Sequence, residues 1–441
     1  MAHSPTSAIP KYLERYAETE IHQLPALLRE RSFDYALAIP AYRESPDFVH
    51  RLANTLFTQH ACLLIVIINQ PDHLSFSDTS DSADSSNTAL WQHLLKLVEP
   101  DKQHYNQNRD QVFVELGFSK TETETKIKTE SNKSSALLMV DRFTRGRAIP
   151  LQQGVGLARK IAADIALSLI ATKTVKHPWI WNSDADAHLP KDYFSVIPLN
   201  KKSTQVNNAA YIYPFRHTSI NDTEENTKIS SATRLYEQSL DYYVAGLHWA
   251  GSPYAFHTLG STVAVNGEHY AQVRGFPKRA GAEDFYLLNK LVKTGVIETL
   301  DSAEIEIESR PSNRVPFGTG PAVEKLLALP ELSEAQLFYH PEIFKQLKTW
   351  LTALPKLFNC SLEELEIEKS THSTLLEMNV DAAIAHAKAH SHSEAGFCRQ
   401  MNTWFDGFRT LKFIHLLRDT GYGSISLDSA KNVDFFSPDI R

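Results

Sequence analysis

Two aspartates separated by one residue, Asp184 and Asp186, follow directly after the apolar run 179–181. Such a run is typical of a buried strand, and alternate positions just beyond a strand can place both side chains at one rim of a sheet. Two carboxylates this close repel each other unless a cation lies between them. Mg²⁺ or Mn²⁺ would meet that need through oxygen ligands and would leave room for the phosphates of a substrate. The sequence therefore predicts a metal site at Asp184 and Asp186.

A second acidic pair, Glu283 and Asp284, opens a predicted helix after the glycine-punctuated loop 274–282. Acids in a first helical turn interact favourably with the helix dipole, and this alone would account for the pair. The same dipole would keep Asp284 ionised at neutral pH, as a general base must be. The pair is therefore interpreted either as dipole partners or as a general base at Asp284.

Cations follow another glycine turn, where Arg159 and Lys160 lie just after Gly154 and Gly156 at the start of a predicted helix. Glycines there allow close approach of another group to the backbone, and a helix N-terminus attracts anions. A glycine turn before an ordinary surface helix has the same composition, so both interpretations stay open.

The elements around these residues alternate between strand and helix patterns. Strands are expected at 33–39, 63–68, 136–140, 179–181, 210–213, 260–265 and 305–308, and helices at 11–31, 47–58, 90–98, 154–169, 229–247 and 268–273. This order predicts an α/β fold with a mixed sheet flanked by helices. Ligands of such sheets bind at the carboxyl ends of the strands, which is where the acids and cations are expected.

Two regions depart from this alternation. Residues 72–135 are interpreted as an insertion, with a polar, low-complexity run at 75–87 that favours a mobile loop and a charged run at 120–135. Beyond residue 322 the pattern is helical, over 322–329, 333–355, 361–390 and 394–418. The expected domains are thus an N-terminal helix (1–32), an α/β domain (33–321) and a helical C-terminal region (322–441). In that region His386 and His390 are four residues apart and could share a helix face as metal ligands, although an exposed helix end also explains them.

Composition excludes several classes of protein. The chain has 441 residues and a net charge of -7, so no general basic field would draw it onto nucleic acid. Its 3 cysteines are too few and too scattered for a disulfide framework or a zinc site. The N-terminal residues lack the apolar core of a signal peptide, and no apolar run is long enough to span a membrane. We therefore expect a reduced, soluble, cytoplasmic protein.

The motifs in their order resemble family 2 glycosyltransferases of the GT-A fold. The resemblance is carried by five segments: the first strand with IPAYRES (39–45), the strand ending at Asn69, the glycine turn with Arg159, SDADAH (183–188) and RGFPKRAGAEDFYLL (274–288). The segment RVPFGTG (314–320) is also similar to a piece found in some bacterial members. Together these segments cover about residues 33–320. The insertion and the helical tail depart from the minimal family pattern.

The resemblance implies a site for a nucleoside-diphosphate sugar along the carboxyl edge of the sheet. A divalent metal, Mn²⁺ or Mg²⁺, would be held by Asp184 and Asp186 on the diphosphate, with Arg159 nearby. Asn69 would face the base, where many relatives carry Asp, and the nucleoside would be bordered by Pro40, Ala41, Tyr42 and Glu44.

The resemblance also assigns the reacting groups. Asp284 would be the base of an inverting enzyme, and Glu283 would position the acceptor. Arg314 or Arg310 would clamp the diphosphate or an anionic acceptor. His188 or His257 would be either a third metal ligand or a structural histidine.

The predicted function is metal-dependent transfer of a sugar, expected to be a hexose, to an acceptor hydroxyl with inversion. One alternative is a retaining transferase that makes a sugar glycerate-type solute. Another is a sugar-nucleotide-binding protein without turnover, whose helical tail binds partners. In any of these cases the helical tail could also cover the acceptor site, form an oligomer or serve as a separate small domain. A nucleotidyltransferase is disfavoured, because the first loop lacks the glycine-rich sequence with Arg and Lys that such enzymes carry.

Overall fold

The computed structural model describes residues 7–72, 85–116, 135–198, 207–219, 224–301, 304–309 and 318–437. The chain divides into two compact units. The first comprises Met1–Thr218 and Thr258–Glu308, and the second comprises Ser219–His257 and Ser309–Arg441. Each unit has a hydrophobic core of its own.

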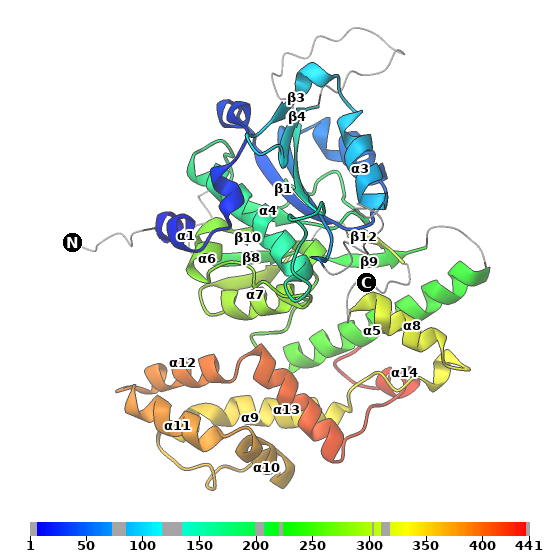
Figure 1. Ribbon diagram of the computed structural model, residues 1–441. Coiled ribbons are helices and arrows are strands. Elements are labelled where there is room, and N and C mark those ends of the chain that lie inside the picture. The colour runs from blue at the N-terminus through cyan, green and yellow to red at the C-terminus, as the bar shows by residue number, and fades with distance from the viewer. Residues whose placement is uncertain are drawn as a thin grey trace. The chain divides into compact units, whose positions relative to one another are not determined.

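A mixed sheet forms the centre of the first unit (Figure 1). Among the described residues it has nine strands in the order β11-β8-β10-β6-β1-β2-β5-β4-β3. Their bounds are β1 Tyr35–Ala41, β2 Cys62–Asn69, β3 Gln103–Tyr105, β4 Gln111–Glu115, β5 Ala136–Arg142, β6 Trp179–Asn182, β8 Asn208–Ile212, β10 Val263–Asn266 and β11 Val296–Thr299. This confirms the α/β fold with a mixed sheet flanked by helices.

The central strands are parallel and buried along their whole length. β1 pairs with both β2 and β6, and β2 pairs with β5, all in parallel register. Unbroken aliphatic runs such as that of β2 suit strands whose two faces are covered by other elements. Helix α4 (Gly154–Ala171) packs on β1 and β2, and Figure 1 shows α3 (Ser85–Leu95) on the other side of β1. The carboxyl ends of β1, β2, β5 and β6 therefore meet at one edge.

A small second sheet holds the chain just after the Asp-x-Asp segment. It consists of β7 (Ala187–His188), β12 (Ile305–Glu308) and β9 (Phe215–Thr218), with β12 in the middle. The backbone N–H of Glu308 donates to the carbonyl of Asp186 at 3.2 Å. The backbone of Asp186 is thus fixed by a strand more than a hundred residues away in sequence.

The prediction of one N-terminal helix over 11–31 is wrong. The chain forms a short helix α1 (Ile9–Arg15) and two turns of 3-10 helix at Thr19–His22 and Ala26–Glu30. Pro25 has no N–H to donate and clashes with the preceding helical turn, which separates the last two pieces.

A buried polar network fixes this N-terminal segment on α4. The Asp164 carboxylate accepts hydrogen bonds from the hydroxyls of Tyr12 (2.5 Å) and Tyr270 (2.9 Å). It also accepts from the Lys160 ammonium (2.8 Å) and from the backbone N–H of Glu18 (2.8 Å). Lys160 is only 4% exposed and is committed to this network, so it stabilises the fold instead of offering a free cation to an anion.

The expected insertion at 72–135 contributes to the sheet. Residues 73–84 and 117–134 lie outside the described residues, and with them most of the predicted mobile loop and of the charged run. The predicted helix is present as α3, shifted towards the N-terminus. β4, which the sequence did not indicate, pairs antiparallel with β5, and β3 follows at the edge.

The second unit is helical, as expected for the C-terminal region. It comprises α5 (Glu224–Trp249), α8 (Thr319–Leu327), α9 (Pro341–Ala353), α10 (Lys369–Glu377), α11 (Val380–Ala389), α12 (Glu394–Trp404), α13 (Gly407–Thr420) and α14 (Leu427–Ala430). The sequence analysis assigns α5 to the 33–321 range, whereas in the structure it packs with α8 and α9. None of the helices in the described ranges has both the length and the hydropathy needed to cross a bilayer.

Two predicted long helices are each divided. The range 361–390 breaks at Asn379, which has a left-handed φ of 61°. The range 394–418 breaks before Asp406, whose side chain accepts a hydrogen bond from the N–H of Arg409 and so begins α13. Asn and Asp favour such positions because their short polar side chains satisfy backbone groups locally.

Candidate active site

The Asp-x-Asp segment lies at the carboxyl edge of the large sheet, as predicted. β6 ends at Asn182, and the N–H of Ser183 still donates to the carbonyl of Ala38 in β1 (3.0 Å). The Asp184 side chain is 34% exposed, and Asp186 is also partly exposed. Burial raises the pKa of Asp184 to about 6, Arg159 opposes this rise, and the neighbouring Asp186 adds to it. The two carboxylates therefore repel each other, as the sequence indicated.

Arg159 is the centre of the site. Its side chain is 5% exposed, and its guanidinium donates to Asp184 Oδ1 and to Glu283 Oε1, each at 2.7 Å. Burial alone would lower the pKa of Arg159, but Asp184 and Glu283 outweigh that effect and raise it. The ion pairs join α4, the end of β6 and α7 (Glu283–Leu291). Asp184 and Glu283, the two partners of Arg159, are both among the acids that the sequence analysis predicts as site residues.

Two glycines make this arrangement possible. A Cβ on Gly260 would lie 2.6 Å from the Arg159 guanidinium, so only glycine leaves room for the buried cation. A Cβ on Gly156 would lie 2.5 Å from the carbonyl oxygen of Pro277, and the N–H of Gly156 donates to the carbonyl of Arg279 at 2.9 Å. The close approach predicted at the start of α4 is thus made by the 277–280 loop of the chain itself.

The two acids at the start of α7 have different environments. Glu283 is 4% exposed and is held by Arg159. Asp284 is partly exposed, and its Oδ1 accepts the N–H of Phe285 at 2.7 Å. Burial and the charge of Glu283 raise the pKa of Asp284 to about 7, against the opposing effect of Arg159. Burial and the charge of Glu283 therefore act against the helix dipole, which favours the ionised form of Asp284.

The residues expected around a nucleoside lie at the ends of β1 and β2. Pro40 and Ala41 are buried within β1, whereas Tyr42 and Glu44 are partly exposed just beyond it. Asn69 ends β2 and is 6% exposed. Arg310 and Arg314 lie outside the described residues.

Several buried polar atoms at this edge have no hydrogen-bond partner among the described residues. They include Oδ1 of Asn69, Oδ1 of Asn182 and Oγ of Ser183. Buried polar groups are nearly always paired, so such a concentration at strand ends indicates a place where a ligand or water completes the hydrogen bonding.

Asn87 is a residue that the sequence analysis missed. It lies in the first turn of α3, is fully buried, and accepts the N–H of Arg43 at its Oδ1 (2.9 Å). Its Nδ2 donates to the carbonyl of Asn69 (3.2 Å). Asn87 thus ties the loop after β1, where Arg43 has a φ of 56°, to the end of β2. In the sequence it is the last residue of the polar run 75–87, and nothing there distinguishes it from its neighbours.

The two histidines considered as a third ligand of the Asp184 and Asp186 site each contact an acid. His188 Nε2 lies 3.0 Å from Glu308 Oε1, and His257 Nε2 lies 2.9 Å from Asp241 Oδ1, the latter pair within the second unit. His386 and His390 are exposed, with ring centroids 4.2 Å apart.

Within the described ranges, no three or more His, Cys, Asp and Glu side chains are gathered as metal ligands. A metal at this place would therefore have two carboxylates, Asp184 and Asp186, as its protein ligands, and one oxygen of Asp184 is bonded to Arg159. That set fits Mg²⁺ or Mn²⁺ ions whose remaining ligands are water and substrate phosphates. It does not fit a metal held by protein side chains alone.

No protein-family model matches the chain, and no curated protein matches it. Among solved structures, it is similar to S. aureus TarS 1-349 in complex with UDP-GlcNAc, with a TM-score of 0.35 and 12% identity over 85% of this chain and 91% of that chain. It is also similar to the mannosyltransferase PcManGT from Pyrobaculum calidifontis in complex with GDP-Man and Mn2+. For that chain the TM-score is 0.31 and the identity 15%, over 89% of this chain and 93% of that chain.

The Arg159 ion pairs generate a prediction about stability. Arg159→Lys keeps the charge but cannot reach both acids with a planar fork, so one buried carboxylate loses its partner. We expect the free energy of unfolding in urea to fall by about 1–3 kcal/mol. The matched control is Arg145→Lys at an exposed position. Equal stability of the two variants would contradict the role of Arg159 as the bridge.

The raised pKa of Asp284 generates a prediction about pH. Its pKa is about 7 in the folded chain and about 3.8 in the unfolded chain, so between these values the folded state binds more protons. In metal-free buffer, stability should therefore decrease as the pH rises from about 4 to 7, and Asp284→Asn should flatten this decrease. Urea unfolding at several pH values measures the slope, with Asp301→Asn as the exposed control. A slope that Asp284→Asn leaves unchanged would show that other groups cause it.

Proposed function

We propose that this protein is a glycosyltransferase of the GT-A type, resembling family 2, which transfers a sugar from a nucleoside-diphosphate sugar to an acceptor hydroxyl. The observation that carries the proposal is the cluster at the carboxyl edge of the sheet. There Arg159 bonds both Asp184 and Glu283, beside Asp186 and Asp284. Residues of these types can bind a divalent metal, stabilise the charge of a donor diphosphate and act as a general base.

Asp184 and Asp186 would bind the divalent metal of the donor complex. Bound there, Mn²⁺ or Mg²⁺ would stabilise the negative charge that grows on the leaving nucleoside diphosphate. Arg159 is buried and bonded to Asp184 Oδ1, so its role is to hold the orientation of that carboxylate. It would also contribute positive charge near the leaving group without contacting it directly.

Asp284 would be the general base. It would accept the proton of the acceptor hydroxyl as the oxygen attacks the anomeric carbon from the face opposite the diphosphate, which inverts the configuration. A pKa of about 7 suits this task, since a base works best when its pKa lies near the working pH. Glu283 is bonded to Arg159, so we propose that it positions Arg159 and does not contact the acceptor.

The nucleoside would lie across the ends of β1 and β2. The unpaired Oδ1 of Asn69 is an acceptor that could bond an N–H of the base, and Tyr42 and Glu44 are exposed enough to contact the ribose or base. The anomeric configuration of the product distinguishes this proposal from a retaining transferase, which would keep the configuration of the donor sugar. A binding protein without turnover would form no product.

The experiment that tests the proposal is thermal unfolding with UDP, GDP, CDP or ADP, each with and without Mn²⁺. A ligand at about 100 times its dissociation constant stabilises a protein by roughly 2.7 kcal/mol, a shift of several degrees. We expect one nucleotide to raise Tm only with Mn²⁺, and Asp186→Ala to abolish the rise. Asp284→Asn should keep the rise but lower the rate of sugar transfer by about 100- to 10,000-fold.

Two outcomes contradict this scheme. If no nucleotide raises Tm with or without Mn²⁺, the proposed donor site does not exist. If Asp284→Asn transfers sugar at the wild-type rate, Asp284 is not the base.

Asn87 should control donor affinity through the two loops that it joins. Asn87→Ala breaks its bonds to Arg43 and Asn69, so we expect nucleotide affinity to fall about tenfold, the equivalent of one hydrogen bond. The matched control is Asn106→Ala, which removes a buried asparagine that caps the β3–β4 turn through Asp110 and Gln111. Both variants should lose stability, but only Asn87→Ala should raise KM for the donor. Equal donor KM in the two variants would contradict the positioning role.

A further inference from the structure

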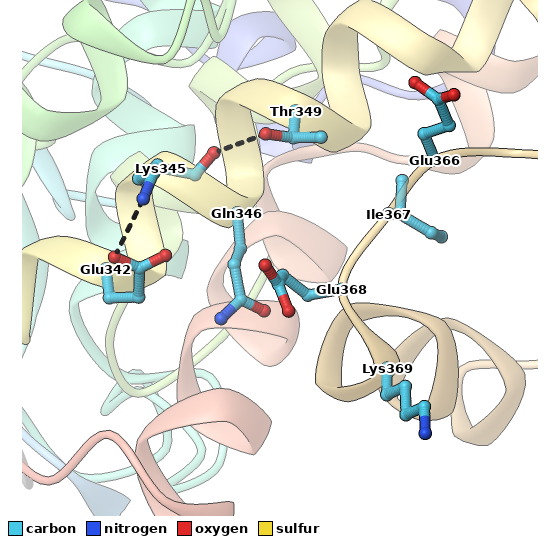
Figure 2. A pocket seen from close by; sticks show the side chains of 8 residues that line it. All are labelled: Glu342, Lys345, Gln346, Thr349, Glu366, Ile367, Glu368 and Lys369. Atoms are coloured by element: carbon cyan, nitrogen blue, oxygen red, sulfur yellow. Dashed lines mark hydrogen bonds and ion pairs between the residues drawn. The ribbon is translucent and has the colours of Figure 1, made fainter.

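The second unit contains a pocket of about 310 Å³ that the proposed function does not use. One wall is a face of α9, where Glu342, Lys345, Gln346 and Thr349 recur at helical spacing. The other wall is the segment 366–369, which leads into α10. Figure 2 shows the Gln346 side chain between that of Glu342, on the same helix, and that of Glu368 in this segment.

The buried side-chain amide of Gln346 forms hydrogen bonds through its oxygen but not through its nitrogen. It is 1% exposed, and its Oε1 accepts hydrogen bonds from the hydroxyls of Ser370 (2.9 Å) and Thr371 (2.6 Å). Its Nε2 has no partner, although both hydrogens can donate. An unpaired buried donor costs about 1–3 kcal/mol, so the pocket favours a ligand that offers an acceptor atom.

The pocket also contains hydrogen-bond acceptors and further donors around Gln346. The exposed carboxylates of Glu366 and Glu368 can only accept hydrogen bonds when ionised. Further donors come from Lys345 and Lys369 and from the first turn of α10, because the Glu368 side chain does not cap that helix. The pocket thus presents donors and acceptors side by side.

We propose that this pocket binds one neutral saccharide unit. Sugar hydroxyls donate and accept at the same time, which matches the mixed lining. An anion would meet three glutamates against two lysines, and a divalent cation would meet two ammonium groups. The volume lies at the small end of the roughly 300–1,000 Å³ range of ligand sites, as suits a short saccharide.

The test is ligand-observed NMR titration of the full chain with glucose, galactose, mannose and N-acetylglucosamine, and separately with phosphate and acetate. We expect at least one sugar to bind, and Gln346→Met, which has no amide, to bind it at least about tenfold more weakly. Gln400→Met is the matched control, because it makes the same substitution in the same unit outside the pocket. Glu368→Gln changes an exposed side chain without disturbing the fold, and it should weaken binding even if Gln346→Met fails to fold.

Three results would overturn the proposal. The first is that no sugar binds to the wild type, and the second is that Gln346→Met and Glu368→Gln both bind the sugar as tightly as the wild type. The third is that phosphate or acetate binds in a Gln346-dependent way. Thermal unfolding of the same samples with nucleotide and Mn²⁺ separates the two proposals. Nucleotide binding without sugar binding removes only the pocket, whereas Gln346-dependent sugar binding without nucleotide binding removes only the glycosyltransferase assignment.

Discussion

The ion pairs of one buried arginine organise the proposed active site. Removing the charge of Arg159 from water is costly, and the protein offsets the cost with two carboxylates at hydrogen-bond distance. These carboxylates come from the end of β6 and the start of α7, so the arginine on α4 fixes the relative position of three elements. Gly260 then has to lack a side chain, because the guanidinium fills the space beside it.

The acids around Arg159 also act on one another. Asp186 and Glu283 add to the rise in the pKa of Asp184, and Glu283 and Asp184 add to the rise in the pKa of Asp284, whereas Arg159 opposes both rises. A divalent cation bound beside these acids would therefore relieve part of their repulsion. The charge distribution thus links the proposed metal site and the proposed base, since binding a cation at one changes the proton affinity of the other.

Much of the architecture was predictable from local pattern. The aliphatic run of β2 and the tryptophan run of β6 were typical of buried strands, and their polar ends predicted the edge of the sheet at which the acids lie. The local pattern could not predict which residues of different elements would contact each other. The hydrogen bonds from Arg159 to Glu283, from Asn87 to Asn69 and from Glu308 to Asp186 are contacts of this kind. The predicted N-terminal helix over 11–31 was wrong for a local reason, because Pro25 interrupts a range that otherwise has helical spacing.

Two buried polar regions of the first unit show how structural and functional polarity differ. Around Asp164, two tyrosine hydroxyls, a lysine and a backbone N–H surround one carboxylate, which leaves the network satisfied by the protein alone. At the ends of β2 and β6, in contrast, Asn69, Asn182 and Ser183 each bury a polar atom with no partner from the protein. The first arrangement stabilises the fold as it stands, whereas the second costs stability until something else completes it. Because the unpaired atoms lie at the same sheet edge as Asp184 and Asp186, the folded chain is best satisfied there with a polar ligand bound.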